Sequence, residues 1–364
     1  MTDLGFMRLA LRLALQARGK TSPNPIVGAV IVKGGRIVAT GYHRRSGADH
    51  AEITALKKAK NKARGATLYV TLEPCSHFGK TPPCVDKIIE SGVRKVVIGM
   101  IDPNPVNNGK SVLKLRRAGV KVRVGFLIEE LKEANEAFLK FIKYKMPFVV
   151  VKCAQTLDGK IATKQGQSKW ITSKEARDFT HRMRNDFDAI LVGSRTVLAD
   201  NPGLNAPQKS KKIKKIIVDS TLQVSLGASL FKHTNPGDIF IAVTKNTTKK
   251  KIEKFRKKGI RIVVCPAIKG RVDLKWLFGE LTRKGITNIL VEGGSKIIGS
   301  LFKARLVNKA LMVLAPKIMG DESAISSVRG FRVRNVNNTI RLDDVSVKRI
   351  GEDILVEGYV HGNR

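Results

Sequence analysis

Aromatic residues, cysteines and long apolar runs are all scarce in this 364-residue sequence. Phe, Trp and Tyr make up 5% of the chain and do not interleave with basic residues, so no RNA-binding module is predicted. Four cysteines do not form the disulfide framework of a small secreted domain. No apolar run approaches the ~20 residues that span a bilayer, so no membrane partner is expected.

No charged segment followed by an apolar segment opens the sequence, so no secretory leader is expected. We therefore predict a cytoplasmic protein. Hydrophobic residues make up 42% of the chain, which indicates a globular protein rather than a disordered one. The length favours two domains, each with its own core.

Acidic residues are few: 30 Asp and Glu stand against 68 Lys and Arg, a formal net charge of +38. Such a field attracts polyanions, so a nucleic-acid partner must be weighed. The basic residues are spread along the chain and are denser only at residues 209–215 and 249–258. Solvated lysine-rich faces explain this pattern more simply, and nucleic acid is not the expected partner. An anionic, phosphorylated substrate would associate faster in the same field.

One group of residues is typical of a metal site: His50-Ala51-Glu52 and, later in the sequence, Pro74-Cys75 with Cys84. One imidazole and two thiols with an open fourth position are the ligands of a catalytic zinc. Glu52, two residues from the histidine, is a natural proton carrier at such a site. The alternative is a surface histidine with two buried thiols, but Cys84 follows an exposed-looking Thr-Pro-Pro turn.

The periodicity of the first half predicts helices alternating with strands after an opening hairpin at Gly34-Gly35, a three-layer α/β domain. Asp49 is the expected N-cap of the helix that carries His50 and Glu52. A strand over 67–71 leads to Cys75, and a helix over 84–90 begins at Cys84, where a thiolate is favoured. The other predicted elements are helices over 4–16, 109–118 and 127–145 and strands over 26–32, 36–42, 94–100 and 120–124.

Pro147 ends the last of these helices, so we place the domain boundary near 145, giving domains 1–145 and 146–364. The second half again alternates strands and helices, and Cys153 and Cys265 are expected as buried thiols in strands. Glycine turns follow strands at 193–196 and 293–295. Such turns let backbone amides approach a phosphate, but they also serve as ordinary turns, and neither is the G-x-G-x-x-G fingerprint.

The nucleobase-deaminase signature is H-x-E followed by P-C-x-x-C, whereas eight residues separate Cys75 from Cys84 here. With that spacer, residues 21–30, 50–52, 74–84 and 102–105 closely resemble the deaminase half of the bifunctional riboflavin-biosynthesis deaminase–reductases. The resemblance implies a cytidine-deaminase-like fold. It implies zinc ligands at His50, Cys75 and Cys84, proton transfer by Glu52, and a substrate pocket with Asn24 and the Asp102–Asn104 turn.

Residues 156–162, 168–172, 192–200 and 291–294 resemble the reductase half of that family, which has a dihydrofolate-reductase-like fold and uses NADPH. Arg184 would suit the ribose 5-phosphate as a guanidinium fork, and Lys152 would polarise the reacting sugar centre. The implied substrate contacts are Ser168, Arg184, Leu204 and Glu292. The implied NADPH contacts are Ala154, Trp170, Thr196, Asp200, Ser220, Gly294, Ser295, Lys296, Ile297, Ile298, Gly299 and Ser300.

The sequence departs from the family pattern at several points. Asp49 stands where proline is usual, and residues 106–111 lack the second glycine of a Gly-x-Gly. Arg195 stands where a small residue is usual, and Asn205-Ala206-Pro207 replaces a segment that often holds a substrate-binding arginine. The last two departures lie in the reductase half, where phosphate binding would then depend more on Arg184 or a nearby lysine.

The resemblance predicts a homo-oligomeric enzyme that deaminates 2,5-diamino-6-hydroxy-4-(5-phosphoribosylamino)pyrimidine and then reduces the ribosyl chain with NADPH. One alternative is a zinc deaminase of nucleic-acid bases whose basic C-terminal half is not catalytic; salt-steep RNA binding with deamination would favour it. Another is a non-catalytic, metal-stabilised binding protein. In that case Glu52→Gln would leave every function intact.

Overall fold

A computed structural model describes residues 1–78, 82–207, 212–232 and 234–363. Residues 79–81 of the predicted cysteine spacer and 209–211 of the predicted basic run lie outside the described residues. The chain divides into two compact units, unit 1 (Met1–Lys145) and unit 2 (Met146–Arg364).

Unit 1 is built on one five-stranded sheet with the order β2-β1-β3-β4-β5. The first two pairings, β1 with β2 and β1 with β3, are antiparallel, and the remaining pairings are parallel. Its elements are α1 (Asp3–Leu15), β1 (Gly28–Lys33), β2 (Arg36–Tyr42), α2 (Ala51–Ala59), β3 (Thr67–Leu72), α3 (Cys84–Glu90), β4 (Lys95–Met100), α4 (Lys110–Arg117), β5 (Lys121–Val124), α5 (Ile128–Ala134) and α6 (Glu136–Tyr144).

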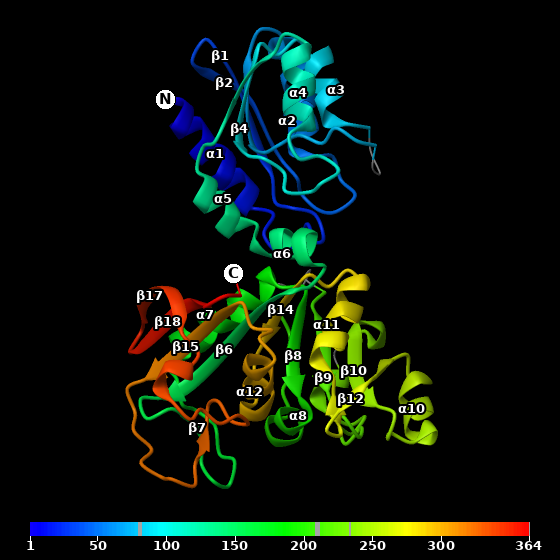
Figure 1. Ribbon diagram of the computed structural model, residues 1–364, viewed down its shortest axis with the longest axis vertical. Coiled ribbons are helices and arrows are strands. Elements are labelled where there is room, and N and C mark those ends of the chain that lie inside the picture. Colours follow the sequence, from blue (N-terminus) through cyan, green and yellow to red (C-terminus); the bar gives the residue numbers. More distant parts are fainter. Residues whose placement is uncertain (79–81, 208–211, 233, 364) are drawn as a thin grey trace. The chain divides into compact units, whose positions relative to one another are not determined.

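Helices cover both faces of this sheet, with α1 on one side and α2, α3 and α4 on the other (Figure 1). Successive strand residues point to opposite faces, so Val30 packs toward α1 while Ala29 and Ile31 pack toward α2. Gly34 and Gly35, both with positive φ, form the predicted hairpin turn. The predicted three-layer α/β arrangement is confirmed.

Two local predictions in unit 1 are wrong. The helix expected over 127–145 is broken at Asn135. The Asn135 side chain accepts a hydrogen bond from the Ile26 amide at 2.8 Å and donates one to the Ile26 carbonyl at 3.3 Å, and these bonds hold Asn135 outside the helix. Asp49 is not the N-cap of α2: His50 occupies that position, and the Asp49 carboxylate pairs with Lys57 at 2.6 Å.

Unit 2 is built on a nine-stranded sheet with the order β11-β10-β9-β8-β14-β6-β15-β18-β17. Neighbouring strands are parallel from β11 to β15, and β18 and β17 add antiparallel edge strands. Its helices are α7 (Lys174–Met183), α8 (Ser194–Asp200), α9 (Ser229–Lys232), α10 (Lys249–Arg256), α11 (Leu274–Arg283) and α12 (Ser295–Lys303). Its strands are β6 (Phe148–Thr156), β7 (Lys160–Ala162), β8 (Ala189–Gly193), β9 (Lys214–Val218), β10 (Ile239–Thr244), β11 (Arg261–Cys265), β12 (Ala267–Ile268), β13 (Arg271–Val272), β14 (Asn288–Val291), β15 (Lys309–Ala315), β16 (Ile325–Ser326), β17 (Leu342–Ile350) and β18 (Asp353–Val360).

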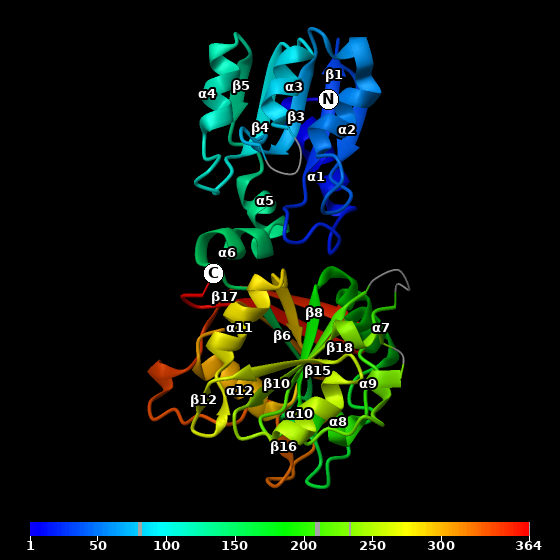
Figure 2. The same ribbon diagram turned by 90° about the vertical axis from the view of Figure 1, so that its right-hand side faces the viewer.

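The apolar sides of α11 and α12 pack on one face of this sheet (Figure 2). Cys153 on β6 and Cys265 on β11 lie in that core, as predicted for buried thiols. Ser173 caps α7, accepting a hydrogen bond from the Ala176 amide at 3.3 Å. The carboxyl ends of the parallel strands and the helices that follow them surround the cavity described below.

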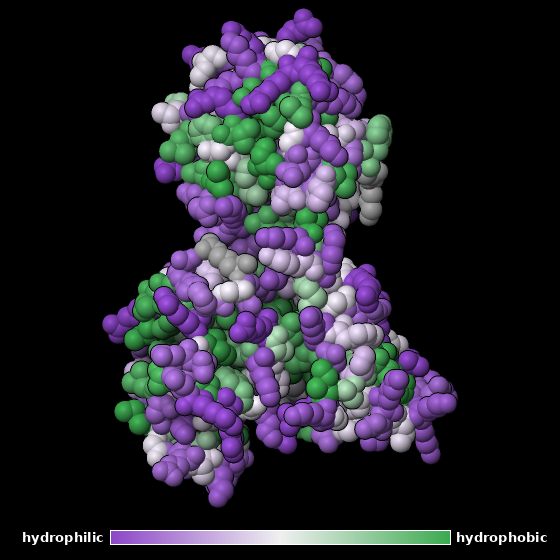
Figure 3. Space-filling model, viewed as in Figure 1, coloured by the Kyte–Doolittle hydropathy of each residue, from purple (hydrophilic) through white to green (hydrophobic). Residues whose placement is uncertain are grey.

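Much of the face that Figure 3 shows is hydrophilic. In unit 2, purple side chains cover α10, whose sequence is rich in lysine (Figure 3). This agrees with the interpretation of the 249–258 run as a solvated face. Of the described helices, none combines the length and apolar character needed to cross a bilayer.

Candidate metal centre and cofactor cavity

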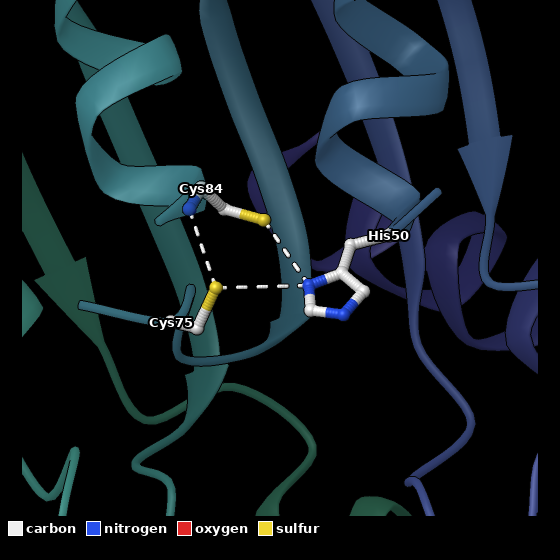
Figure 4. A group of neighbouring side chains, drawn as sticks. All are labelled: His50, Cys75 and Cys84. Atoms are coloured by element: carbon white, nitrogen blue, oxygen red, sulfur yellow. Dashed lines mark hydrogen bonds between the residues drawn. The ribbon is translucent and has the colours of Figure 1, made fainter. Parts of the chain in front are cut away.

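Three side chains of unit 1 converge on one point. His50 Nδ1 lies 3.2 Å from Cys84 Sγ and 3.7 Å from Cys75 Sγ. One ligand atom from each of the three residues lies within 4.8 Å of the others. Figure 4 shows the ring nitrogen directed toward both sulfur atoms. One nitrogen and two sulfurs in this arrangement fit the donor set of a catalytic zinc.

Three chain segments bring these atoms together. His50 precedes the first turn of α2, Cys75 follows β3, and Cys84 is the first residue of α3. The Cys84 amide donates to Cys75 Sγ at 3.2 Å, and the Val85 amide donates to the Cys75 carbonyl at the same distance. The amino terminus of α3 therefore holds the Cys75 segment and favours a thiolate there.

Glu52 lies on the first turn of α2 and is only 3% exposed. Burial raises the pKa of Glu52 to about 7, although His50 opposes the shift. A hydrogen bond from the Cys84 thiol lowers the pKa of Cys75 to about 4, and the same contact raises the pKa of Cys84. A bound dication favours the deprotonated form of both thiols.

The sequence analysis did not predict a group of buried polar residues that bonds the chain around Cys75. Asn107 donates to the Pro74 carbonyl at 3.0 Å and accepts from the Ser76 amide at 2.9 Å. The buried Glu73 carboxylate accepts from the amides of Asp102, Gly109 and Ser111 at 2.9–3.1 Å. The loop that departs from the family's glycine pattern therefore fixes the segment on both sides of Cys75. The Asn-Asn-Gly spacing signals a turn, but not these partners.

The sequence analysis did not predict a role for His43 either. His43 is 3% exposed, and its ring meets the His50 ring edge-on with centroids 5.3 Å apart. His43 Nδ1 donates to the Asp49 carbonyl at 3.1 Å, so Nε2 accepts from the Asn24 amide at 3.3 Å. Burial lowers the pKa of His43, which favours this neutral form. The structure therefore joins Asn24 to the metal centre through His43.

In unit 2, a cavity of about 750 Å³ gathers most of the predicted reductase residues. It is lined by all the predicted cofactor positions except Gly299, by the predicted substrate contacts Ser168 and Glu292, and by Lys152. The lining cofactor positions are Ala154, Trp170, Thr196, Asp200, Ser220, Gly294, Ser295, Lys296, Ile297, Ile298 and Ser300.

Gly299 does not line this cavity. A Cβ at this position would lie 1.9 Å from the Arg329 carbonyl oxygen, so Gly299 allows the 329 segment to pack against α12. The Arg329 amide also donates to the Ser295 carbonyl at 3.3 Å. The position therefore serves close packing beside the cavity.

Arg184 and Leu204 do not line the cavity either, yet Arg184 reaches one of its lining residues. Its Nε and Nη2 donate to the two carboxylate oxygens of Glu292, each at 2.7 Å. Both side chains are 11% exposed. The guanidinium fork therefore engages Glu292 in this structure, while its predicted role toward the ribose phosphate stays a prediction.

Four cations line one side of the cavity: Arg195, Arg271, Lys296 and Arg329. The charge of Arg195 is the largest cause of a lowered pKa at Lys296. At the amino terminus of α12, the buried Ser295 Oγ has no hydrogen-bond partner among the described residues. A helix terminus, an orphaned hydroxyl and clustered cations fit the phosphates of a dinucleotide such as NADPH.

Trp170 is 64% exposed and is not a core residue. The Arg177 guanidinium lies over its ring, 4.2 Å from the centroid. Lys317 donates to the carbonyls of Trp170 and Ile171 at 3.1 and 2.8 Å. An exposed indole held at the cavity mouth provides a flat surface for a planar ring.

Fold and sites together define a two-unit protein that pairs a deaminase-type metal centre with a dinucleotide-type reductase cavity. Residues 1–100 match the cytidine and deoxycytidylate deaminase zinc-binding region, and residues 147–356 match the RibD C-terminal domain. The riboflavin biosynthesis protein RibD of Aquifex aeolicus is 43% identical over 97% of each chain. That of Actinobacillus pleuropneumoniae is 44% identical over 99% of this chain and 96% of its own.

The chain belongs to the RibD family of riboflavin-biosynthesis proteins. Two solved structures are also similar, each over 98% of both chains: Acinetobacter baumannii RibD, with a TM-score of 0.88 and 31% identity, and a Thermotoga maritima protein, with 0.85 and 37%. The latter is described as a diaminohydroxyphosphoribosylaminopyrimidine deaminase/5-amino-6-(5-phosphoribosylamino)uracil reductase. The predicted family and the predicted combination of a cytidine-deaminase-like and a dihydrofolate-reductase-like fold are confirmed.

Proposed function

We propose that this chain catalyses two consecutive steps of riboflavin biosynthesis. Unit 1 deaminates 2,5-diamino-6-hydroxy-4-(5-phosphoribosylamino)pyrimidine, and unit 2 reduces the ribosyl chain of the resulting uracil to ribityl. The convergence of His50, Cys75 and Cys84 beside the buried Glu52 is the observation that carries this proposal. The predicted homo-oligomeric state and cytoplasmic location stay predictions.

In unit 1, His50, Cys75 and Cys84 would hold zinc, which when bound supplies a Lewis acid that activates water at neutral pH. Glu52 accepts a proton from the attacking water and returns protons to the ring nitrogen and the departing ammonia. Its raised pKa, about 7, suits a group that both takes and gives a proton. His43 holds the Asn24 amide by its nitrogen, which leaves the carbonyl oxygen of Asn24 as an acceptor for the pyrimidine.

In unit 2, the cavity would hold NADPH, which when bound supplies a hydride. Arg195, Arg271, Lys296 and Arg329 bind and orient phosphates at one side of the cavity. Lys152 lines the same cavity and lies near enough to Glu292 to help lower the pKa of that carboxyl. Its ammonium would stabilise negative charge that develops on the ribosyl oxygen during reduction.

Removing the metal is expected to separate the two activities. Dialysis of the whole chain against a zinc chelator should abolish ammonia release while NADPH oxidation with the aminouracil substrate continues, because the two sites belong to different units. Zinc content by atomic absorption, ammonia release and NADPH absorbance are measured on the same sample.

Adding zinc back should restore deamination. If the chelator removed one zinc per chain and deamination persisted, the proposed metal centre would be wrong. A wild-type chain that releases ammonia but never oxidises NADPH would instead refute the reductase assignment alone.

The cation cluster gives a second test. Replacing both Arg195 and Lys296 with alanine should raise the KM for NADPH about tenfold, the change produced by ~1.4 kcal/mol of lost binding energy. The KM for NADH should change less, because NADH lacks the 2′-phosphate. Lys303→Ala, at the other end of α12, is the matched control and should leave both values within about twofold. Equal losses for both cofactors would contradict a role in selecting NADPH.

A further inference from the structure

A buried cation of unit 2 takes no part in the chemistry described above. Lys215 lies on β9, which runs between β8 and β10 inside the sheet, and only 1% of its surface is exposed. Lysine is rarely buried to this extent without a paired carboxylate. Among the described residues, no carboxylate forms an ion pair with Lys215, and the charge that acts on it most is the like charge of Arg184.

Three neutral oxygens meet the Lys215 ammonium instead. Its Nζ donates to the Gly203 carbonyl at 2.5 Å, to Asn205 Oδ1 at 2.8 Å and to Thr234 Oγ1. The three donors of the ammonium are thereby used. Burial and the Arg184 charge lower the pKa of Lys215 to about 8, so the charged form is held at a cost.

Two of these three acceptors belong to one short loop, residues 203–205, and they lie on either side of Leu204. Leu204 is 4% exposed and has a φ of +52°, a left-handed conformation that is unfavourable for a residue with a branched side chain. Bonds from one ammonium to the residue before and the residue after hold the loop in this conformation.

The same loop contacts Arg184, a predicted substrate-binding residue. Arg184 Nη1 donates to the Asn205 carbonyl at 2.8 Å, while the rest of its guanidinium engages Glu292, which lines the cavity. A continuous chain of hydrogen bonds therefore runs from Lys215 through Asn205 and Arg184 to the cavity.

We propose that Lys215 is a positioning residue of the reductase: it clamps the 203–205 loop and thereby places Leu204 and the Arg184–Glu292 pair for the phosphoribosyl substrate. This inference rests on the proposed reductase function.

The test uses the full-length chain carrying Lys215→Met, which keeps the length of the side chain and removes its charge and donors. The KM for 5-amino-6-(5-phosphoribosylamino)uracil should rise on the order of tenfold to a hundredfold, as expected for a misplaced binding loop. The KM for NADPH should stay within about twofold, because the Lys215 clamp lies outside the cofactor positions.

Two milder variants separate positioning from general damage. Asn205→Ala breaks the link between the clamp and the loop, whereas Thr234→Val removes an acceptor of the same ammonium outside the loop. Asn205→Ala should raise the substrate KM, and Thr234→Val should raise it much less. The double variant Lys215→Met/Asn205→Ala should be no worse than Lys215→Met alone, because both changes break the same link.

Fluorescence of Trp170 and Trp276, the two tryptophans of the chain, reports whether unit 2 is folded. If Lys215→Met fails to fold, the comparison of Asn205→Ala with Thr234→Val decides the question. The proposal is overturned if the substrate KM does not change, if both KM values rise together, or if Thr234→Val acts as strongly as Asn205→Ala. A wild-type chain without reductase activity would refute the proposed function itself.

Discussion

Replacing Glu52 with glutamine is expected to lower the kcat for deamination by about 10²–10⁴-fold, the usual contribution of a positioned acid–base group. Glutamine has nearly the same shape but cannot accept a proton from water or return one to the ring nitrogen. Zinc should remain bound at one ion per chain, because His50, Cys75 and Cys84 are unchanged. Ammonia release, zinc content and NADPH oxidation are measured in parallel, and NADPH oxidation with the aminouracil substrate should be unaffected.

Asp49→Asn is the matched control for this experiment. Asp49 is a carboxylate three positions from Glu52, but its side chain is 42% exposed and pairs with Lys57 at 2.6 Å. An exposed ion pair contributes about 0–1 kcal/mol, so this variant should keep its zinc and almost all of its deaminase activity. Full deaminase activity in Glu52→Gln would exclude Glu52 as the proton carrier and would favour a metal-stabilised binding protein.

The part of the metal centre that the sequence predicted is local. His50 and Glu52 lie within one helical turn, and Cys75 and Cys84 flank a single loop, so residue type and spacing were enough to indicate them. His43, Glu73 and Asn107 support that centre through contacts over many residues. The bond between Asn107 and the Pro74 carbonyl, for example, spans 33 positions. No periodicity or spacing rule relates positions so far apart.

Asn135 shows that a contact between distant positions can also change the secondary structure that periodicity predicts. Apolar periodicity predicted one helix over 127–145, but a hydrogen bond from the Ile26 amide, 109 positions away, interrupts it.

Lys215 shows that the exposure of a side chain cannot be predicted from its charge alone. It ends the basic run 209–215, which suggested a solvated face, yet it lies on β9, where Lys215, Ile216 and Ile217 are all buried. The solvated face predicted for the basic run is therefore wrong at Lys215, because the inner strands of a parallel sheet are covered on both faces.

The Arg184–Glu292 pair combines stability with function in unit 2. Burial alone would raise the pKa of Glu292, but two hydrogen bonds and the charge of Arg184 outweigh burial and lower it. Removing one partner of a buried pair leaves the other charge without compensation. Arg184→Met should therefore destabilise unit 2 by about 3–5 kcal/mol and raise the KM for the aminouracil substrate. Urea unfolding followed by tryptophan fluorescence measures the stability change, since both tryptophans belong to unit 2.

Arg182→Met, two positions earlier on α7, is the matched control. Arg182 is exposed, so this variant should change stability by no more than about 0.5 kcal/mol. Comparable destabilisation by Arg182→Met and Arg184→Met would mean that the loss comes from the helix and not from the ion pair. Adding Glu292→Gln to Arg184→Met should recover part of the stability, because the unpaired charge is gone.

Lowering the pH should change the contribution of Glu292 to stability in opposite directions in the wild type and in Arg184→Met. In the wild type, the pKa of Glu292 lies below that of the unfolded chain, which is about 4.3. The contribution of Glu292 to stability is therefore fully present above pH ~4.3 and is lost as the pH falls through the folded pKa. Without Arg184, burial raises that pKa above its unfolded value, so protonation relieves the cost of the unpaired charge. The stability gap between the two proteins should narrow as the pH falls through the raised pKa of Glu292 in the variant and then through its lowered pKa in the wild type. A gap independent of pH would show that Glu292 is not the group left unpaired.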